Sequence, residues 1–362
     1  MKNTENRILR WDKKKHTKYG AENKGKWITD NNPYININPE SFDRYTEIDP
    51  PNPNTKMALD PKKMRKFLRD KETPKLGRTF IQYIPGLFTG SMLEKTQKIK
   101  NNKVKTKKYE TLKEKQKLKE EILEELRANE LIGGFTLIDR RYINEEKEYI
   151  FPYDTFLIIG MEMTKDTIME IPQPTTDSGK IFDFDVYHNG GLIVDKLADF
   201  IRRKGVKCFS HIPLKWDINF APHAINAGIG NYSTHGLVLT KEWGTRLRFF
   251  AISIDLDIPI DKPKDYNFEE FCKKCRMCYK ACPTNAIPKE AYDYRGAVKR
   301  RVSIKRCGVG MSENKFCGVC LKVCPFNNFG YEKCMDTLPE YYKYNLMDNE
   351  TGSYDKYEEA GD

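Results

Sequence analysis

Apolar residues return every three or four positions in two stretches of the chain, and this spacing predicts two amphipathic helices. The first runs from Leu112 to Arg127, with Glu and Lys on the opposite face, and we expect Gly133 and Gly134 to end it. The second runs from Leu192 to Arg203. Gly205 follows it at the position where glycine commonly terminates a helix.

Four short apolar runs, bounded by charged or proline-containing segments, predict buried strands. They are Phe135–Ile138, Thr155–Gly160, Leu237–Thr240 and Phe249–Ile254. Pro222 opens a further short helix that reaches Ala227, because proline is tolerated in the first turn of a helix. The alternation of helices and strands from about residue 110 to 260 predicts a layered core of the α/β or α+β class.

Eight of the ten cysteines form two sets near the C-terminal end of the chain. The first set is Cys272, Cys275, Cys278 and Cys282, followed by Pro283. The second set is Cys307, Cys317, Cys320 and Cys324, followed by Pro325. The first spacing, C-x2-C-x2-C-x3-C-P, is the bacterial ferredoxin run, in which three thiolates bind one 4Fe-4S cluster and the fourth binds the other.

This crossing pattern predicts the ligands of two 4Fe-4S clusters. Cluster one is assigned to Cys272, Cys275, Cys278 and Cys324. Cluster two is assigned to Cys282, Cys307, Cys317 and Cys320, with Cys307 displaced upstream relative to a minimal ferredoxin. Two zinc ribbons or a disulfide framework are the alternatives. Zinc ligands lack the crossing C-x3-C-P ends, and disulfide frameworks belong to small secreted chains, so both fit less well.

The formal net charge is +11, and eleven lysines lie between Lys95 and Lys119. Such a stretch can bind nucleic acid, but bases also need aromatic side chains on which to stack, and Tyr109 is the one aromatic residue there. A solvated helix or linker fits this stretch better. We therefore do not expect a nucleic-acid partner.

No apolar run approaches the roughly 18 residues that span a bilayer, and residues 1–26 are polar throughout, with neither a secretion signal nor a twin-arginine signal. The sequence predicts a cytoplasmic protein with no membrane span. Thiol-ligated clusters suit a reducing, anaerobic cell. Residues 1–90 are rich in Pro, Asn and Lys, which is typical of an extended arm.

The segment from Ala221 to Pro263 resembles the corrinoid-dependent reductive dehalogenases and their relatives, the epoxyqueuosine reductases. The shared order of parts is a helix ending in Ala-Gly-Ile-Gly, the strand Gly-Leu-Val-Leu-Thr, Glu-Trp-Gly-x-Arg-x-Arg, an apolar strand ending in Asp-Leu, and a ferredoxin domain. Upstream, Tyr187 to Phe209 looks like the tyrosine-led helix of the dehalogenases. The resemblance covers about residues 110–330.

This resemblance implies an α/β (α+β) fold, with a nitroreductase-like layered core that binds base-off cobalamin, followed by a bacterial-type ferredoxin domain with two 4Fe-4S clusters. The expected units are an N-terminal arm and Lys-rich linker (1–109), the core (110–264), the ferredoxin domain (265–330) and a tail (331–362). The implied function is an oxidoreductase that passes electrons through both clusters to the corrinoid for reductive dehalogenation of an organohalide or a similar cleavage. The implied partners are a low-potential ferredoxin or flavodoxin and a small-molecule substrate.

By the same resemblance, Tyr187 is the expected proton donor. A phenol has an ordinary pKa near 10 and needs a nearby cation to act as an acid, for which Lys215, Arg246 and Arg248 are the candidates. The residues expected to contact the cofactor are Gly228, Gly230, His235 and Gly236. A dinucleotide loop fits less well, because Ser233 stands where G-x-G-x-x-G needs its third glycine.

Two other functions stay open. An epoxyqueuosine reductase would act on tRNA, but its ferredoxin segment lies in the middle of the chain, and its catalytic aspartate would align near Leu214, with Asp217 reached only by a shift. The third possibility is a corrinoid-free electron-transfer protein. Thr234 stands where dehalogenases commonly carry a basic residue, which leaves the substrate class open.

Overall fold

The computed structural model describes a core region and most of the cysteine-rich region. The described residues are 89–143 without 91 and 94, 151–169, 185–213, 218–282, 286–288, 291–294, 297–300, 302, 307 and 318–336. Most of the predicted arm, most of the predicted tail, Lys215 and Cys317 lie outside this part of the chain.

The core is built on a four-stranded sheet in the order β1-β2-β6-β3. The strands are β1 (Ile132–Leu137), β2 (Thr155–Glu162), β3 (Cys208–His211) and β6 (Leu247–Ile254). Every neighbouring pair is antiparallel. The two central strands are almost continuously apolar and buried, as expected for strands covered on both faces.

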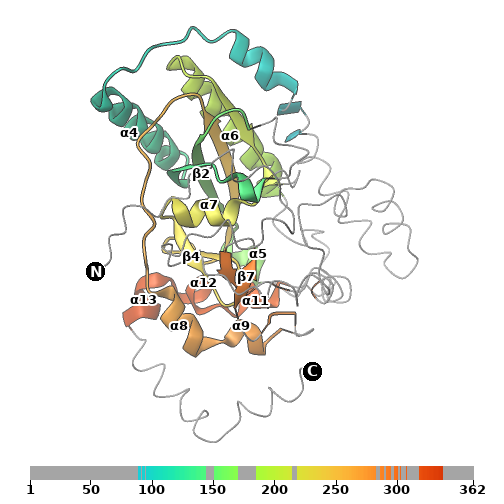
Figure 1. Cartoon of the computed structure of the whole chain (residues 1–362). Coiled ribbons are helices and arrows are strands. Elements are labelled where there is room, and N and C mark those ends of the chain that lie inside the picture. Colours follow the sequence, from blue (N-terminus) through green and yellow to red (C-terminus); the bar gives the residue numbers. More distant parts are fainter. Residues whose placement is uncertain are drawn as a thin grey trace, which may run out of the picture.

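Helices cover both faces of this sheet (Figure 1). The long helices α4 (Leu112–Ala128) and α6 (Asp185–Arg203) share a buried apolar cluster with Leu157 and Phe250. The adjacent residues Phe156 and Ala251 belong to a second cluster, which includes the short helix α7 (Phe220–Asn226). Neighbouring strand residues point to opposite faces, so the two clusters make a three-layer core.

The predicted helices and strands are present, with several changed boundaries. Helix α4 begins at a capping box, in which Thr111 and Glu114 bind each other's backbone, and it ends at Ala128. The prediction that Gly133 and Gly134 end this helix was wrong, because both lie in β1. A Cβ at Gly133 would lie 2.7 Å from the carbonyl oxygen of Ile158, so close strand contact explains that glycine.

Helix α6 begins at Asp185, seven residues before the predicted start at Leu192. The glycines at 190 and 191 hid this extension, since glycine lowers helix propensity. A Cβ at Gly190 would lie 2.3 Å from the ring of Phe250, so the missing side chain lets α6 approach the sheet.

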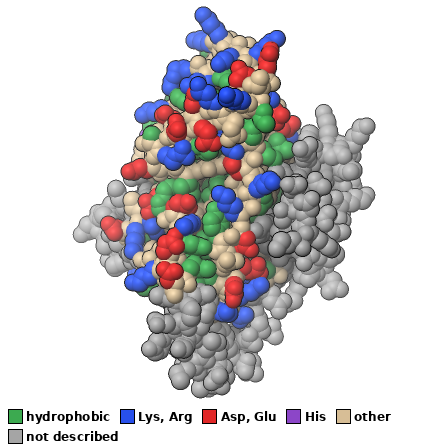
Figure 2. Space-filling model, turned by 90° about the vertical axis from the view of Figure 1, so that its left-hand side faces the viewer, with side chains coloured by type: hydrophobic (Ala, Val, Ile, Leu, Met, Phe, Trp, Pro, Cys, Tyr) green, Lys and Arg blue, Asp and Glu red, His purple; other side chains and the backbone are tan. Residues whose placement is uncertain are grey.

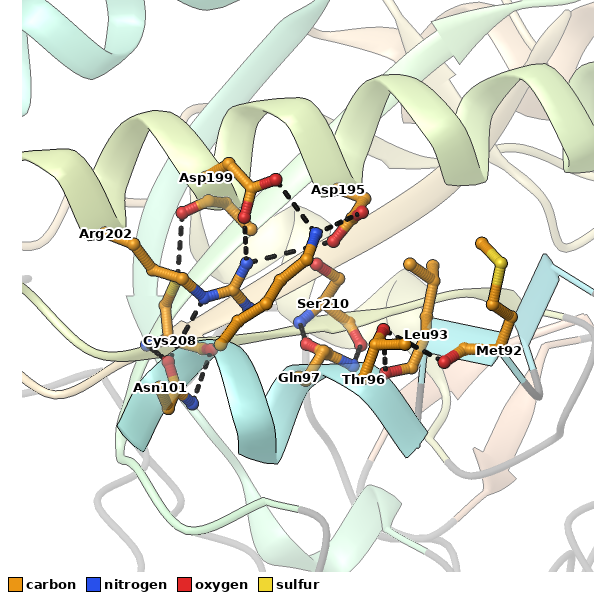
Figure 3. A network of polar contacts seen from close by, with 12 residues as sticks. Met92, Leu93, Thr96, Gln97, Asn101, Asp195, Asp199, Arg202, Cys208 and Ser210 are labelled. Carbon is orange, nitrogen blue, oxygen red and sulfur yellow. Dashed lines mark hydrogen bonds and ion pairs between the residues drawn. The ribbon is translucent and has the colours of Figure 1, made fainter. Parts of the chain in front are cut away.

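The open edge of the sheet at β3 is closed by side chains from residues 95–102, which are helical (Figure 3). The amide of Asn101 donates to the carbonyl of Cys208 (3.0 Å) and accepts from its N–H (3.2 Å). The amide of Gln97 makes the same pair of bonds to Ser210. Arg202 of α6 joins the network by donating to Asn101 (3.1 Å). Two side-chain amides thus replace a neighbouring strand.

The cysteine-rich region lies at one end of the core, next to the hairpin of β4 (Gly230–Tyr232) and β5 (Val238–Thr240) (Figure 1). Its described helices are α8 (Phe268–Cys275), α9 (Met277–Lys280), α11 (Val319–Lys322), α12 (Pro325–Phe329) and α13 (Tyr331–Asp336). The remaining short elements are η3 (Arg140–Tyr142), α5 (Lys165–Met169), β7 (Tyr292–Tyr294) and β8 (Ala297–Lys299). Strands β3, β4, β7 and β8 were not predicted.

On the face shown in Figure 2, basic and acidic side chains are intermingled. Helix α8 illustrates the pattern, because Lys273 pairs with Glu269 and Lys274 with Glu270, one turn apart. Among the described helices, none is both long enough and apolar enough to cross a membrane.

Candidate functional site

The four cysteines assigned to cluster one come together, although Cys324 is 46 residues from Cys278 in the sequence. Burial raises the pKa of the Cys278 thiol, and the proximity of Cys272, Cys324, Cys320 and Cys275 raises it further. Loss of water also raises the pKa of Cys272 to about 11. The fold therefore gathers thiols in a site that water does not solvate well.

A single metal ion needs ligands that converge on one point. Among the described residues, no three His, Cys, Asp or Glu side chains converge closely enough to hold a single ion. The thiolates of a 4Fe-4S cluster bind separate irons and stand farther apart than the ligands of one zinc ion. The thiols of Cys272, Cys275 and Cys324 are close enough to Cys278 to raise its pKa, and their joint ligation of a 4Fe-4S cluster stays a prediction.

For cluster two, the structure describes three of the four expected ligands. Cys282 follows α9 and its sulfur accepts a hydrogen bond from the N–H of Ala286 at 3.2 Å. Cys320 lies in α11 and packs against a small cluster that contains Met163, next to the end of β2. Cys307 is half-buried. Their joint ligation of a cluster remains a prediction, because Cys317 lies outside the described residues.

Tyr187, the expected proton donor, lies in the first turn of α6 and is half-buried. The guanidinium carbon of Arg248 is 5.3 Å from the centroid of its ring. Arg246 instead donates to the carboxylate of Glu162 and to the carbonyl of Met163 at 2.9 Å. Of the two arginines proposed as partners, Arg248 is therefore the one that the structure places against Tyr187.

The three glycines expected at the cofactor lie against the protein's own backbone. A Cβ would lie 2.4 Å from the Lys262 carbonyl oxygen at Gly228, and 2.0 Å from that of Arg300 at Gly236. At Gly230 it would meet the carbonyl oxygen of Leu239 at 2.1 Å. Internal packing therefore explains why these positions need glycine, and contact with a cofactor remains a prediction.

His235 lies in the turn between β4 and β5 and is almost fully buried. Its Nδ1 atom is 3.2 Å from the hydroxyl of Ser233, and its buried Nε2 atom has no hydrogen-bond partner in the described part of the chain. Burial lowers the pKa of His235 to about 4, so its ring is neutral near pH 7. The preceding residue, Thr234, donates its hydroxyl to the carbonyl of Cys272 at 3.1 Å.

The other two core histidines have satisfied rings. His223 bonds the carbonyl of Asn219 and accepts from the N–H of Asp139, both at 2.9 Å. His211 bonds the hydroxyl of Ser253 at 2.9 Å. Sequence reasoning could not separate these histidines from His235, because the difference lies in their tertiary partners.

One residue that joins the two regions was missed from the sequence. Asn327 accepts from the N–H of Thr245 at 2.7 Å and donates to the carbonyl of Leu321 at 2.7 Å. It therefore fixes α11, which carries Cys320, and α12, which Cys324 precedes, to the core. A lone asparagine carries no spacing signal that could have revealed this role.

Comparisons with known proteins agree with the site. The family described as a 4Fe-4S dicluster domain matches residues 271–328. A tetrachloroethene reductive dehalogenase of Desulfitobacterium hafniense is 32% identical over 155 residues, which cover 39% of this chain and 28% of that protein. An epoxyqueuosine reductase of Vibrio cholerae is 35% identical over 117 residues, which cover 30% of each chain. A solved catabolic reductive dehalogenase has 22% identity and a TM-score of 0.48, over 54% of this chain and 30% of that one.

The chain spans about three tenths of the length of the two curated relatives named above. Both relatives are reductive enzymes, and the match at 271–328 favours iron-sulfur clusters over zinc ribbons or disulfides. The resemblance drawn from the sequence is thus confirmed: over part of its length the chain is similar in sequence to reductive dehalogenases and epoxyqueuosine reductases, and it matches a 4Fe-4S dicluster domain toward its C-terminal end.

Proposed function

We propose that this chain is a cytoplasmic reductive dehalogenase-like oxidoreductase, which passes electrons from a low-potential ferredoxin or flavodoxin through two 4Fe-4S clusters to a corrinoid. The observation that carries the proposal is the junction between the two regions. There Cys272, a ligand of cluster one, is hydrogen-bonded to the turn of the core that holds His235. We assign the core a nitroreductase-like fold and place its boundary with the ferredoxin domain near residue 265.

A bound corrinoid supplies a low-potential cobalt centre that can cleave a carbon–halogen bond. The residues of this chain that would hold it are those of the β4–β5 turn. An acceptor atom without a partner inside a protein costs stability, so the buried Nε2 atom of His235 is consistent with a partner outside the chain. Gly236, the glycine of this turn, packs against the backbone of Arg300.

The protein's other task is to deliver a proton. Reductive dehalogenation takes up two electrons and one proton, forms a carbon–hydrogen bond and releases halide. We assign the proton to the hydroxyl of Tyr187, whose phenolate form the guanidinium of Arg248 would stabilise. Arg246 acts as a positioning residue, because it holds the end of β2 beside the strand that carries Arg248. Lys215 stays a second candidate partner of Tyr187.

A second candidate function is reduction of an epoxyqueuosine-containing tRNA. The observation that favours it is the 35% identity to the Vibrio cholerae epoxyqueuosine reductase. The expected substrate would then be a tRNA stem-loop instead of an organohalide, with the same clusters and corrinoid.

Anaerobic reconstitution with iron, sulfide and cobalamin tests the proposal. We expect about eight irons and about one cobalt per chain, together with the absorbance of base-off cobalamin. Reduced methyl viologen should then drive halide release from at least one member of an organohalide panel. Turnover of an epoxyqueuosine stem-loop alone would select the second function. Bound iron without bound cobalamin would reject both and leave an electron-transfer protein.

A further inference from the structure

The turn that joins β4 to β5 is closed by hydrogen bonds, and its residues Ser233, Thr234 and His235 are buried. Ser233 donates both its N–H (2.9 Å) and its hydroxyl (2.8 Å) to the carbonyl oxygen of Leu237. The side chain of His235 lies inside this turn and is 2% exposed. A ring held in this way keeps one orientation. Its contacts therefore determine which ring nitrogen donates a hydrogen bond and which accepts one.

The hydrogen bonds of Ser233 decide which ring nitrogen of His235 carries the proton. A serine hydroxyl has one proton, and here the carbonyl of Leu237 takes it, because a carbonyl oxygen can only accept. The contact between the Ser233 oxygen and Nδ1 of His235 at 3.2 Å must then be an N–H donated by Nδ1. In a neutral imidazole the other nitrogen is unprotonated, so Nε2 presents a lone pair.

This lone pair lies at the junction of the core and the cysteine-rich region. The neighbour of His235 on one side, Thr234, bonds the carbonyl of Cys272, and the neighbour on the other side, Gly236, packs against the backbone of Arg300. Nε2 is buried and has no partner among the described residues. The hydroxyl of Tyr232, in the adjoining strand, is likewise buried without a partner in that part of the chain.

We propose that Nε2 of His235 accepts a hydrogen bond from a primary carboxamide on the rim of the bound corrinoid. The inference rests on the proposed function and adds the chemistry of the contact. A fixed acceptor needs an N–H donor, which a carboxamide supplies, whereas a carboxylate or phosphate would meet the lone pair with a second lone pair. His235 thereby selects an amidated corrinoid over its hydrolysed forms.

Binding measurements on the reconstituted iron-sulfur protein test this contact without using activity. The probes are cobalamin and a set of its monocarboxylates, each with one carboxamide hydrolysed, titrated anaerobically and followed by absorbance. We expect at least one monocarboxylate to bind the wild type about tenfold more weakly than cobalamin, a difference of about 1.4 kcal/mol. His235→Phe has no acceptor, so it should bind cobalamin and that monocarboxylate with equal affinity. His235→Gln offers an amide oxygen, so it should keep part of the difference in affinity.

Three results would overturn the inference or the proposed function on which it rests. If every monocarboxylate loses the same affinity in the wild type and in folded, iron-loaded His235→Phe, the contact does not exist. If the cobalt(II) EPR spectrum of bound cobinamide, which has no base of its own, shows nitrogen coupling that His235→Phe removes, then His235 ligates cobalt and the hydrogen-bond role is wrong. If the wild type binds no corrinoid, the proposed function fails, and the inference fails with it.

Discussion

Arg248 lies over the ring of Tyr187, with 5.3 Å between its guanidinium carbon and the ring centroid. The two residues come from different elements, since Tyr187 lies in α6 and Arg248 in β6, 61 residues later in the chain. In the proposed mechanism, this cation would favour the phenolate that remains after proton donation. The pair is therefore the centre of the proposed proton delivery.

Tyr187→Phe should lower turnover of the reconstituted enzyme by about 100-fold or more, the usual contribution of a general acid. Arg248→Gln should lower it less, because the phenol remains but loses its cation. Halide release driven by reduced methyl viologen measures both, and their double variant should be no slower than Tyr187→Phe alone. Full turnover by Tyr187→Phe, with unchanged iron and cobalt content, would remove Tyr187 from the mechanism.

The cysteine assignment predicts how much iron each variant loses. Cys278→Ala should lose about four of about eight irons, because one cluster loses a ligand. Cys208→Ala should keep both clusters, since that thiol is buried under α6 and donates to the carbonyl of Ala198 at 3.3 Å. Cys334→Ala is the nearer control, because Cys334 packs in the same apolar cluster as Cys272 and Cys275. Iron and acid-labile sulfide per chain measure the outcome, and equal losses in all three variants would contradict the assignment.

The amides of Gln97 and Asn101 close the edge of β3, and their removal should destabilise the core. Residues four apart on a helix are separated by about 6 Å along its axis, and alternate residues of a strand by about 6.6 Å, so the two amides match Ser210 and Cys208. Each substitution to alanine leaves one buried N–H and one C=O without that partner, and should cost about 1 to 3 kcal/mol of unfolding free energy.

Denaturant unfolding of Gln97→Ala and Asn101→Ala measures this cost. Gln116→Ala is the matched control, because Gln116 bonds Glu120 on the exposed face of α4 and its loss should stay within about 0.5 kcal/mol. The exposed strand edge should also promote association in the two edge variants, which sedimentation can detect. An edge variant as stable as Gln116→Ala would show that water replaces the amides without cost.

His211 should make the protein sensitive to acid. Burial lowers its pKa to about 3, below its ordinary value of 6.5, so the unfolded chain binds a proton that the folded chain excludes. Its contribution to stability is therefore present above pH 6.5 and is lost as the pH falls from 6.5 toward 3, by up to about 1.4 kcal/mol per pH unit.

Denaturant unfolding at several pH values compares the wild type with His211→Gln, which can keep a bond to Ser253 but does not titrate. Between pH 7.5 and 6.5 the two stability curves should run parallel, and below pH 6.5 that of the wild type should fall more steeply. Parallel curves down to pH 5.5 would show that the folded protein protonates His211 without penalty.

The local signals in the sequence located most of the core. Apolar periodicity found α4 and the C-terminal part of α6, and apolar runs found β2, β5 and β6 within a few residues. The errors in the boundaries of α4 and α6 occurred at glycines. Gly133, Gly134 and Gly190 have low helix propensity by themselves, but in the fold they admit close contact with a strand, a helix end and a ring, respectively, which local pattern does not register.

The site could be predicted only where its residues lie at characteristic intervals along the sequence. The cysteine spacing predicted a domain with two 4Fe-4S clusters. The match of residues 271–328 to the family described as a 4Fe-4S dicluster domain confirms this domain type. The choice between Arg246 and Arg248 as partner of Tyr187 could not be made from the sequence, because sheet register and helix packing decide it.

The sequence by itself determined that this chain carries an iron-sulfur domain next to a layered core, because cluster ligation requires cysteines at fixed short intervals and burial requires apolar periodicity. Only the tertiary structure decided which residues of the core meet that domain. It set His235 apart from His211 and His223, and Arg248 from Arg246, because hydrogen-bond partners and burial come from segments far apart in the chain.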